Sequence, residues 1–184
     1  MEITARSLLT MLHGMGFGAL FLLAFSGAFV QLWRVGQGST AQLANRPVRI
    51  YLLVMTILAW LAVLTGAYII YPWYRAVAPP GAADLSAFPQ ALLKSNPNTV
   101  GWHSFGMEWK EHVAWLAPVS ITMVTAVFFH YGAELRHHIA LRRAILIFVV
   151  VAFLAAGAAG FFGAMINKYA PVQGGHLFHL LHGA

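Results

Sequence analysis

The chain has 184 residues, of which 60% are hydrophobic and only 9% are charged, and it contains no cysteine. Soluble domains carry about 25% charged residues, so this composition excludes an ordinary soluble protein and predicts one integral membrane domain over residues 1–184. The missing cysteines exclude disulfides, thiolate metal sites, iron–sulfur clusters and covalent attachment of a c-type haem. The net charge of +6 is spread over the segments between apolar runs, so we interpret it as topology information and expect no nucleic-acid partner.

Four apolar runs predict membrane-spanning helices. They cover residues 8–33, 50–71, 109–133 and 144–166. Each run has more than the roughly 20 residues needed to cross about 30 Å of hydrocarbon. The connections are short, long and short, which is typical of a bundle whose neighbouring helices are joined in turn. We therefore expect an all-α integral membrane protein, an antiparallel four-transmembrane-helix bundle.

The first two runs have clear limits. The first is too long for the core of a signal peptide, so we expect it to be retained as a helix. Proline disrupts a helix interior, so Pro72 is expected to close the second run.

The long connection, residues 73–107, contains four prolines. Loops of this length in a compact protein are usually functional, so we expect a lid or a docking surface. Within it, residues 82–94 suit a short interfacial helix.

The third run contains a proline, and the fourth contains regularly spaced small residues. Pro118 predicts a kink one turn below His112. In the fourth run, Ala156, Gly160 and Ala164 form a ladder of small residues at every fourth position. Such a ladder is typical of close contact between membrane helices.

The tail, residues 167–184, carries a histidine at every third position: His176, His179 and His182. On a helix these side chains would share a broad face. We interpret the tail as an interfacial or partner-docking helix, with metal capture or haem ligation in a neighbouring subunit as the alternative.

The arginines predict the orientation. Six of them lie in the two short turns, Arg34, Arg46, Arg49, Arg136, Arg142 and Arg143. Short loops rich in arginine face the cytoplasm. We therefore expect both turns inside a bacterial cytoplasmic membrane, and both termini and the long loop outside it.

Two histidines on different runs are predicted to lie at one depth. His13 lies 21 residues before Arg34, and His112 lies 24 residues before Arg136. At about 1.5 Å per residue, both sit roughly 30–36 Å from the inner boundary. Because the first and third helices of an up-and-down bundle run the same way, the two imidazoles can meet near the outer surface and ligate a haem iron.

Glycines follow His13 closely. Gly14, Gly16 and Gly18 lie within five residues of it, and they would let a flat macrocycle approach the backbone. The alternative is that these glycines serve close packing of helices, while His13 merely bonds a neighbour.

Carboxylates surround His112. Glu108 lies four residues before it on the same helical face, and either Glu108 or Glu111 would orient the imidazole by accepting its second N–H. Glu108 and Glu111 are also candidate proton acceptors. An alternative is a non-haem metal held by Glu108, His112 and His103, and a further alternative is an interfacial salt-bridge cluster with Lys110.

Four spans with His13 and His112 at matching depth resemble the four-helix b-type cytochrome subunits that anchor membrane oxidoreductases, such as those of the cytochrome b561 class and of formate dehydrogenases and hydrogenases. The resemblance implies one haem b and electron exchange with a quinone pool or a periplasmic c-type cytochrome on behalf of a partner complex. Cationic side chains level with the site are expected to pair with the haem propionates: Arg6, Arg75, Lys110 and Lys168. The residues support no catalytic chemistry other than redox chemistry.

A second hypothesis comes from a different class of protein. The chain would be a cofactor-free structural or accessory subunit of a large respiratory or photosynthetic membrane complex. It would contact the other membrane subunits through the fourth helix and the tail.

Overall fold

The computed structural model describes residues 2–35 and 46–179, and these contain four helices long and apolar enough to cross a membrane. We call them the first to fourth spans: Ala5–Val35, Arg46–Tyr74, Trp102–His137 and Ile139–Tyr169. The prediction of an all-α membrane protein with four spanning helices is confirmed.

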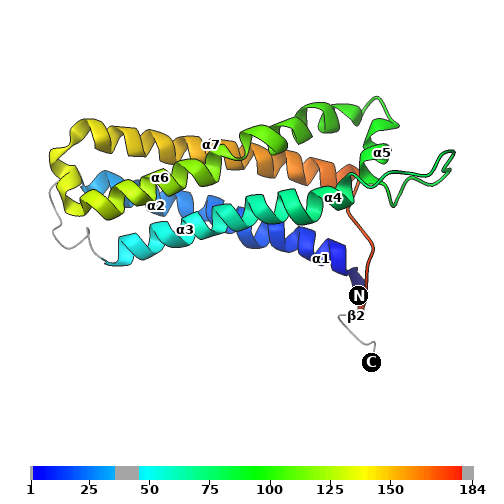
Figure 1. Cartoon of the computed structure of the whole chain (residues 1–184), viewed down its shortest axis with the longest axis horizontal. Coiled ribbons are helices and arrows are strands. Elements are labelled where there is room, and N and C mark those ends of the chain that lie inside the picture. The colour runs from blue at the N-terminus through cyan, green and yellow to red at the C-terminus, as the bar shows by residue number, and fades with distance from the viewer. Residues whose placement is uncertain (1, 36–45, 180–184) are drawn as a thin grey trace.

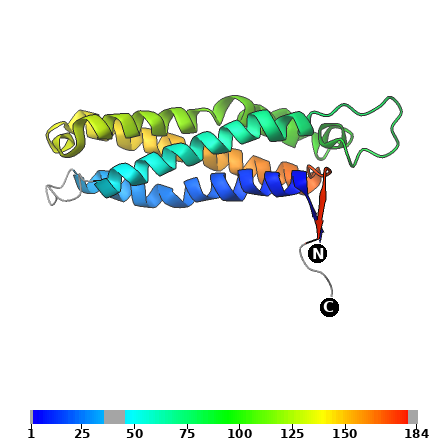
Figure 2. The same ribbon diagram turned by 60° about the horizontal axis from the view of Figure 1, so that its bottom comes forward.

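The spans lie side by side as an up-and-down bundle (Figures 1 and 2). At one end, which we call the turn end, the third span passes into the fourth. At the other, which we call the terminal end, lie the long loop and the two short strands near the chain ends. The first and third spans therefore run in the same direction, as the comparison of His13 with His112 requires.

Three of the four spans are successions of helical types, and the fourth is a single α-helix. The first comprises α1 (Ala5–Met11), the π-helix η1 (Leu12–Ala19) and α2 (Leu20–Val35), and the second comprises α3 (Arg46–Thr65), the π-helix η2 (Gly66–Ile70) and α4 (Tyr71–Tyr74). The third comprises the π-helices η3 (Trp102–Met107) and η4 (Trp109–Val113), then α6 (Leu116–Tyr131) and the 3₁₀-helix η5 (Gly132–His137). The fourth is α7 (Ile139–Tyr169).

Every span extends beyond its apolar run at both ends. An apolar run marks only the part of a helix that crosses hydrocarbon, and a helix continues into the head-group region, where water and polar groups surround it. The long connection is correspondingly shorter than predicted, because residues 73–74 and 102–107 belong to spans.

Pro72 does not close the second span, contrary to the prediction. The helix continues to Tyr74, and the wider π-helix η2 ends at Ile70, two residues before the proline. A proline ring clashes with the carbonyl of the preceding turn in a regular α-helix, and the wider turn provides room for it.

The third span is interrupted at Ala114–Trp115, between η4 and α6. Pro118 has no N–H, and the backbone here tightens, with the Ala117 N–H donating to the carbonyl of Ala114 at 3.1 Å. The sequence predicted a kink at Pro118, and the observed break in the α-helix lies within one turn of it.

The loop and the tail differ from their predictions. The expected helix over residues 82–94 is reduced to α5 (Pro89–Lys94), which begins where a proline can take the first helical position. The tail forms a strand instead of a helix: β2 (Leu177–His179) pairs antiparallel with β1 (Glu2–Thr4). Gly174 and Gly175, with φ of 106° and 81°, take a left-handed conformation that no helix continues. His182 lies outside the described residues.

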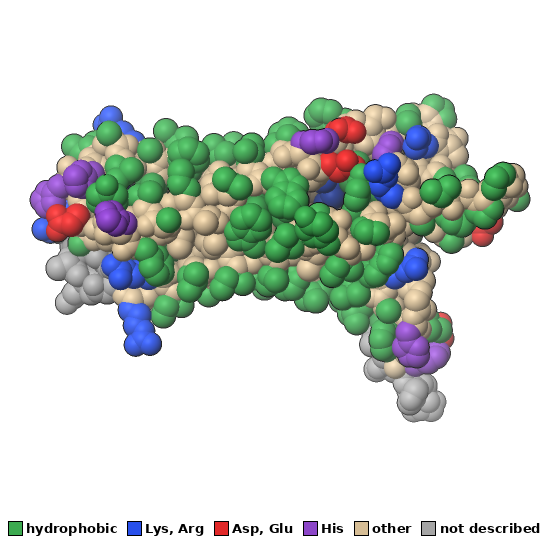
Figure 3. All heavy atoms as spheres, viewed as in Figure 1, with side chains coloured by type: hydrophobic (Ala, Val, Ile, Leu, Met, Phe, Trp, Pro, Cys, Tyr) green, Lys and Arg blue, Asp and Glu red, His purple; other side chains and the backbone are tan. Residues whose placement is uncertain are grey.

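The buried core draws on all four spans. Its largest members include Phe21, Leu52, Ile121, Phe128 and Val149. Large apolar side chains also cover the outside of the bundle between its two ends, as lipid contact requires, while charged side chains and histidines gather at the ends (Figure 3). A smaller cluster at the terminal end packs Leu93 of α5 against Tyr74 and Ile166, so the loop helix is attached to the bundle.

Candidate functional site

The π-helical turns of the bundle gather at its terminal end. The four π-helices of the described spans are η1, η2, η3 and η4, and they contain His13, His103 and His112. π-turns are rare and occur frequently at functional sites, because they redirect side chains at a cost in backbone regularity. Their concentration beside three histidines makes this end the candidate site.

His13 is half-buried and packs against the second span. Its Nδ1 lies 3.2 Å from the hydroxyl oxygen of Thr65. The ring edge faces Gly66 closely enough that a Cβ there would lie 2.7 Å from its Cε1 atom. Within residues 2–35 and 46–179, no hydrogen bond engages the Nε2 of His13.

The glycines after His13 do not serve close packing of helices. A Cβ at Gly14 would meet nothing within 4 Å, and one at Gly16 would meet only Leu12 of its own span. For Gly18 the nearest atom is the carbonyl oxygen of His13, also in the first span. The described part of the chain therefore gives no support to the glycine packing in that alternative, although His13 does bond a neighbour, Thr65, as the alternative expected. Gly14 leaves the backbone open beside the histidine.

Lys110 is the residue of the third span that reaches into the bundle beside His13. Its ammonium donates to the carbonyl of Ala159 in the fourth span at 3.4 Å. It lies close enough to His13 to act on it electrostatically. No described carboxylate lies within salt-bridge distance of it. A lysine inside a membrane span without such a partner is costly, and it is a functional candidate by default.

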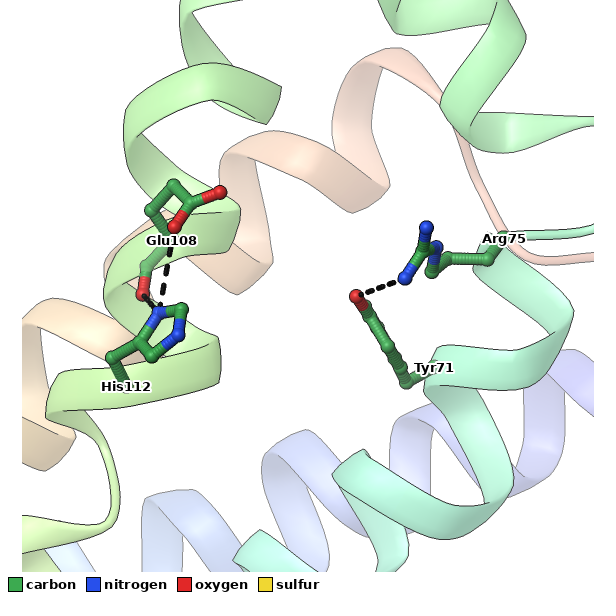
Figure 4. Close-up of polar contacts among 4 residues, drawn as sticks. All are labelled: Tyr71, Arg75, Glu108 and His112. Atoms are coloured by element: carbon green, nitrogen blue, oxygen red, sulfur yellow. Dashed lines mark hydrogen bonds and ion pairs between the residues drawn. The ribbon is translucent and has the colours of Figure 1, made fainter.

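His112 has a different environment. Its side chain is 70% exposed, and its Nδ1 lies 3.1 Å from the carbonyl oxygen of Glu108 and 3.4 Å from a carboxylate oxygen of the same residue (Figure 4). Glu108 thus has the orienting position that the sequence predicted for it or for Glu111.

His13 and His112 point into different surroundings. Lys110 and His112 are two residues apart, and such residues lie on different sides of a helix. The third span therefore turns Lys110 toward the fourth span at the level of His13 and leaves His112 exposed beside Glu108. Pairing of the two imidazoles on one iron stays a prediction.

Tyr71 of the second span and Arg75, which directly follows that span, lie opposite Glu108 and His112 (Figure 4). The guanidinium of Arg75 donates to the Tyr71 hydroxyl at 3.1 Å and stacks over its ring. Glu111 of the third span lies near enough to this hydroxyl to act on it electrostatically. Arg75 is therefore held beside Tyr71 at the terminal end.

His103 is engaged elsewhere. Its Nδ1 lies 2.7 Å from the hydroxyl of buried Tyr74, and its Nε2 lies 3.5 Å from the side-chain amide of Gln90 in α5. The alternative metal set of Glu108, His112 and His103 is consequently not assembled. Among the described residues, no three histidine or acidic side chains come together as metal ligands.

Sequence reasoning missed Thr65 and Gly66. The signal that would have indicated them is a polar residue followed by glycine. The pair lies near the end of an apolar run and level with a histidine on the neighbouring span. Comparison of the chain with protein-family models, with characterised proteins and with solved structures finds no match. The function must therefore be inferred from the site.

Proposed function

We propose that the chain is a membrane-anchored b-type cytochrome subunit that transfers electrons between a quinone pool or a periplasmic carrier and a partner complex. The observation that carries the proposal is the state of the two histidines. His13 and His112 each have Nδ1 beside an oxygen acceptor, while no hydrogen bond of the described chain uses the Nε2 of either of these two residues. Metal-ligating histidines have this arrangement, since the second nitrogen is held by an outer partner.

The donor chemistry fits a haem iron. Two neutral imidazoles are the axial ligands of low-spin b-type haem, and the exposed backbone at Gly14 leaves room for a planar group beside His13. A bound haem supplies one-electron chemistry at a potential that its ligands tune. Gly14 and Gly16 are the backbone positions proposed to face it.

The cations have a role in the same proposal. Lys110 and Arg75 are positioned at the terminal end without a described carboxylate within salt-bridge distance, so they are available to pair with propionates. Glu108 orients His112, and Glu111 is the candidate for accepting a proton from a quinol because it lies near the Tyr71 hydroxyl and is not engaged with a histidine among the described residues.

The visible spectrum of the purified chain tests this proposal. Expression in a haem-producing host should give a sharp Soret band and, on reduction, separate α and β bands. A colourless protein that is monodisperse and helical, and that stays colourless after addition of haemin, would contradict it.

A second candidate is a cofactor-free accessory subunit. Its supporting observation is that Gly160 and Ala164 of the small-residue ladder are exposed, so this face of α7 is open to a helix of a neighbouring subunit. The accessory function predicts a colourless chain that purifies with other membrane subunits. Replacement of Gly160 by leucine should release those subunits.

A further inference from the structure

The hydroxyl of Thr65 has only one proton to donate, and two acceptors already compete for it. Its Oγ1 lies 2.5 Å from the carbonyl oxygen of Leu61 and 3.3 Å from that of Ala62. Both are backbone oxygens and can only accept. Threonine in a membrane helix commonly donates to such a carbonyl of the preceding turn.

The remaining neighbour of this hydroxyl is His13. Since the Thr65 proton points to a carbonyl, the oxygen presents lone pairs to the imidazole, and the contact of 3.2 Å is a hydrogen bond only if His13 Nδ1 carries the proton. A neutral imidazole protonated at Nδ1 has its lone pair on Nε2.

Gly66 fixes the position of the same ring. A Cβ at residue 66 would lie 2.7 Å from the Cε1 atom of His13 and 3.4 Å from each ring nitrogen. The shortest of these distances is one that real side chains do not adopt, so any larger residue would move the imidazole away from Thr65. Gly66 and Thr65 therefore act together on His13: Gly66 fixes the position of the imidazole, and Thr65 favours the proton on Nδ1.

We propose that Thr65 and Gly66 form a seat on the second span that holds His13 as its Nδ1–H tautomer and directs Nε2 to be the atom that binds iron. The seat makes these two residues positioning residues for the haem. This inference rests on the proposed function for its purpose, but the tautomer itself does not depend on haem.

The test measures the tautomer directly in haem-free protein. Nitrogen-15 NMR of histidine-labelled protein in detergent, recorded at about pH 8, above the ordinary histidine pKa, distinguishes protonated from unprotonated ring nitrogens. Comparison with His13→Ala identifies the His13 signals. We expect Nδ1 protonated and Nε2 unprotonated in the wild type and in Thr65→Ser, and a mixture of tautomers in Thr65→Val and Gly66→Ala.

Two matched controls exclude general effects of the substitutions. Thr10→Val removes a hydroxyl that donates to the carbonyl of Arg6 and has no histidine partner among the described residues. Gly157→Ala adds a methyl group at an ordinary contact distance of 3.9 Å from Leu22. Both should leave the His13 signals unchanged.

The outcomes distinguish a failure of the proposed Thr65–Gly66 seat from a failure of the cytochrome proposal. If His13 of the wild type carries its proton on Nε2, or if Thr65→Val keeps the wild-type tautomer, the proposed function of Thr65 and Gly66 is wrong, even if the protein binds haem. If the tautomers are as expected but neither the wild type nor any variant binds haem, the proposed function of Thr65 and Gly66 holds and the cytochrome proposal fails. If both hold, Thr65→Val should retain haem several-fold more weakly than Thr65→Ser.

Discussion

The ammonium of Lys110 reaches from the third span to the carbonyl of Ala159 in the fourth, at 3.4 Å, through a notch left by Gly163. A Cβ at Gly163 would lie 3.0 Å from that nitrogen. One hydrogen bond to a neutral carbonyl does not compensate for the hydration free energy that an ammonium loses inside a membrane bundle. The residue is therefore retained at a cost in stability, and a ligand with a negative oxygen would recover that cost.

Replacing Lys110 by methionine should consequently stabilise the haem-free fold. The methionine fills similar volume without an unpaired charge, and even the replacement of a buried ion pair by apolar residues often stabilises a protein by about 1–4 kcal/mol. We expect a higher unfolding temperature in detergent, together with weaker retention of haem.

Lys168→Met is the control for this substitution, because Lys168 is exposed and stacks on Tyr169. It should leave the unfolding temperature nearly unchanged. A fall in unfolding temperature for Lys110→Met would show that the ammonium has a structural function.

The two chain ends are joined through Thr4. Its hydroxyl oxygen accepts from the backbone N–H of Ser7, which caps α1, and from that of Gly174, both at 3.2 Å. Thr4→Ala removes both bonds. Loss of a helix cap costs about 0.5–2 kcal/mol, and here the tail should also detach from the first span.

Limited proteolysis measures this detachment. Thr4→Ala should be cut within residues 173–179 faster than the wild type, while Thr4→Ser, which keeps the hydroxyl, should resemble the wild type. Equal cutting of all three proteins would mean that the pairing of β1 with β2 holds the tail without Thr4.

The four spans and their directions were predictable because length and apolar content decide whether a helix crosses a membrane. Counting residues from the arginine turns predicted that His13 and His112 lie at one depth, and this stays a prediction. Lys110, which lies near His13, is only two residues from His112.

The direction of each side chain around its helix was not predictable in the same way. In a soluble helix, polarity separates the buried face from the exposed face, but in a span both the core and the lipid are apolar. Nothing in the residue pattern therefore showed that Lys110 and not His112 faces inward. The π-turns in η1 and η4 rotate the side chains further from the regular helical positions.

The strand pairing of the tail depended on contacts between the two ends of the chain. A histidine at every third position suits a helix by spacing alone, but Gly174 and Gly175 turn the backbone just before it. Their left-handed conformation and the pairing with Glu2–Thr4 outweigh the weak helical pattern of this short segment.

Orientation in the membrane is tested with reporter fusions. Because the short turns carry the arginines, a tag after residue 184 or before residue 1 should report from the extracytoplasmic side, and a tag within residues 36–45 from the cytoplasm. A cytoplasmic signal from either terminus would mean that the orientation is opposite to the prediction. The candidate site would then lie at the inner face of the membrane.

The final prediction concerns the two histidines proposed as haem ligands. His13→Ala and His112→Ala should each remove haem or convert it to a high-spin form, because a six-coordinate low-spin haem needs both axial ligands. His130→Ala should leave the spectrum unchanged, since His130 is exposed near the turn end and contacts the Tyr131 ring. It serves as the matched control.

The two ligand variants need not behave alike, and the difference is informative. His13 sits in its seat on Thr65 and Gly66, whereas His112 is 70% exposed and held by Glu108 alone. Loss of haem in His13→Ala with a wild-type spectrum in His112→Ala would leave His13 as the single ligand among the two and assign the second axial position to another residue. Wild-type spectra and full haem content in both variants would reject the site.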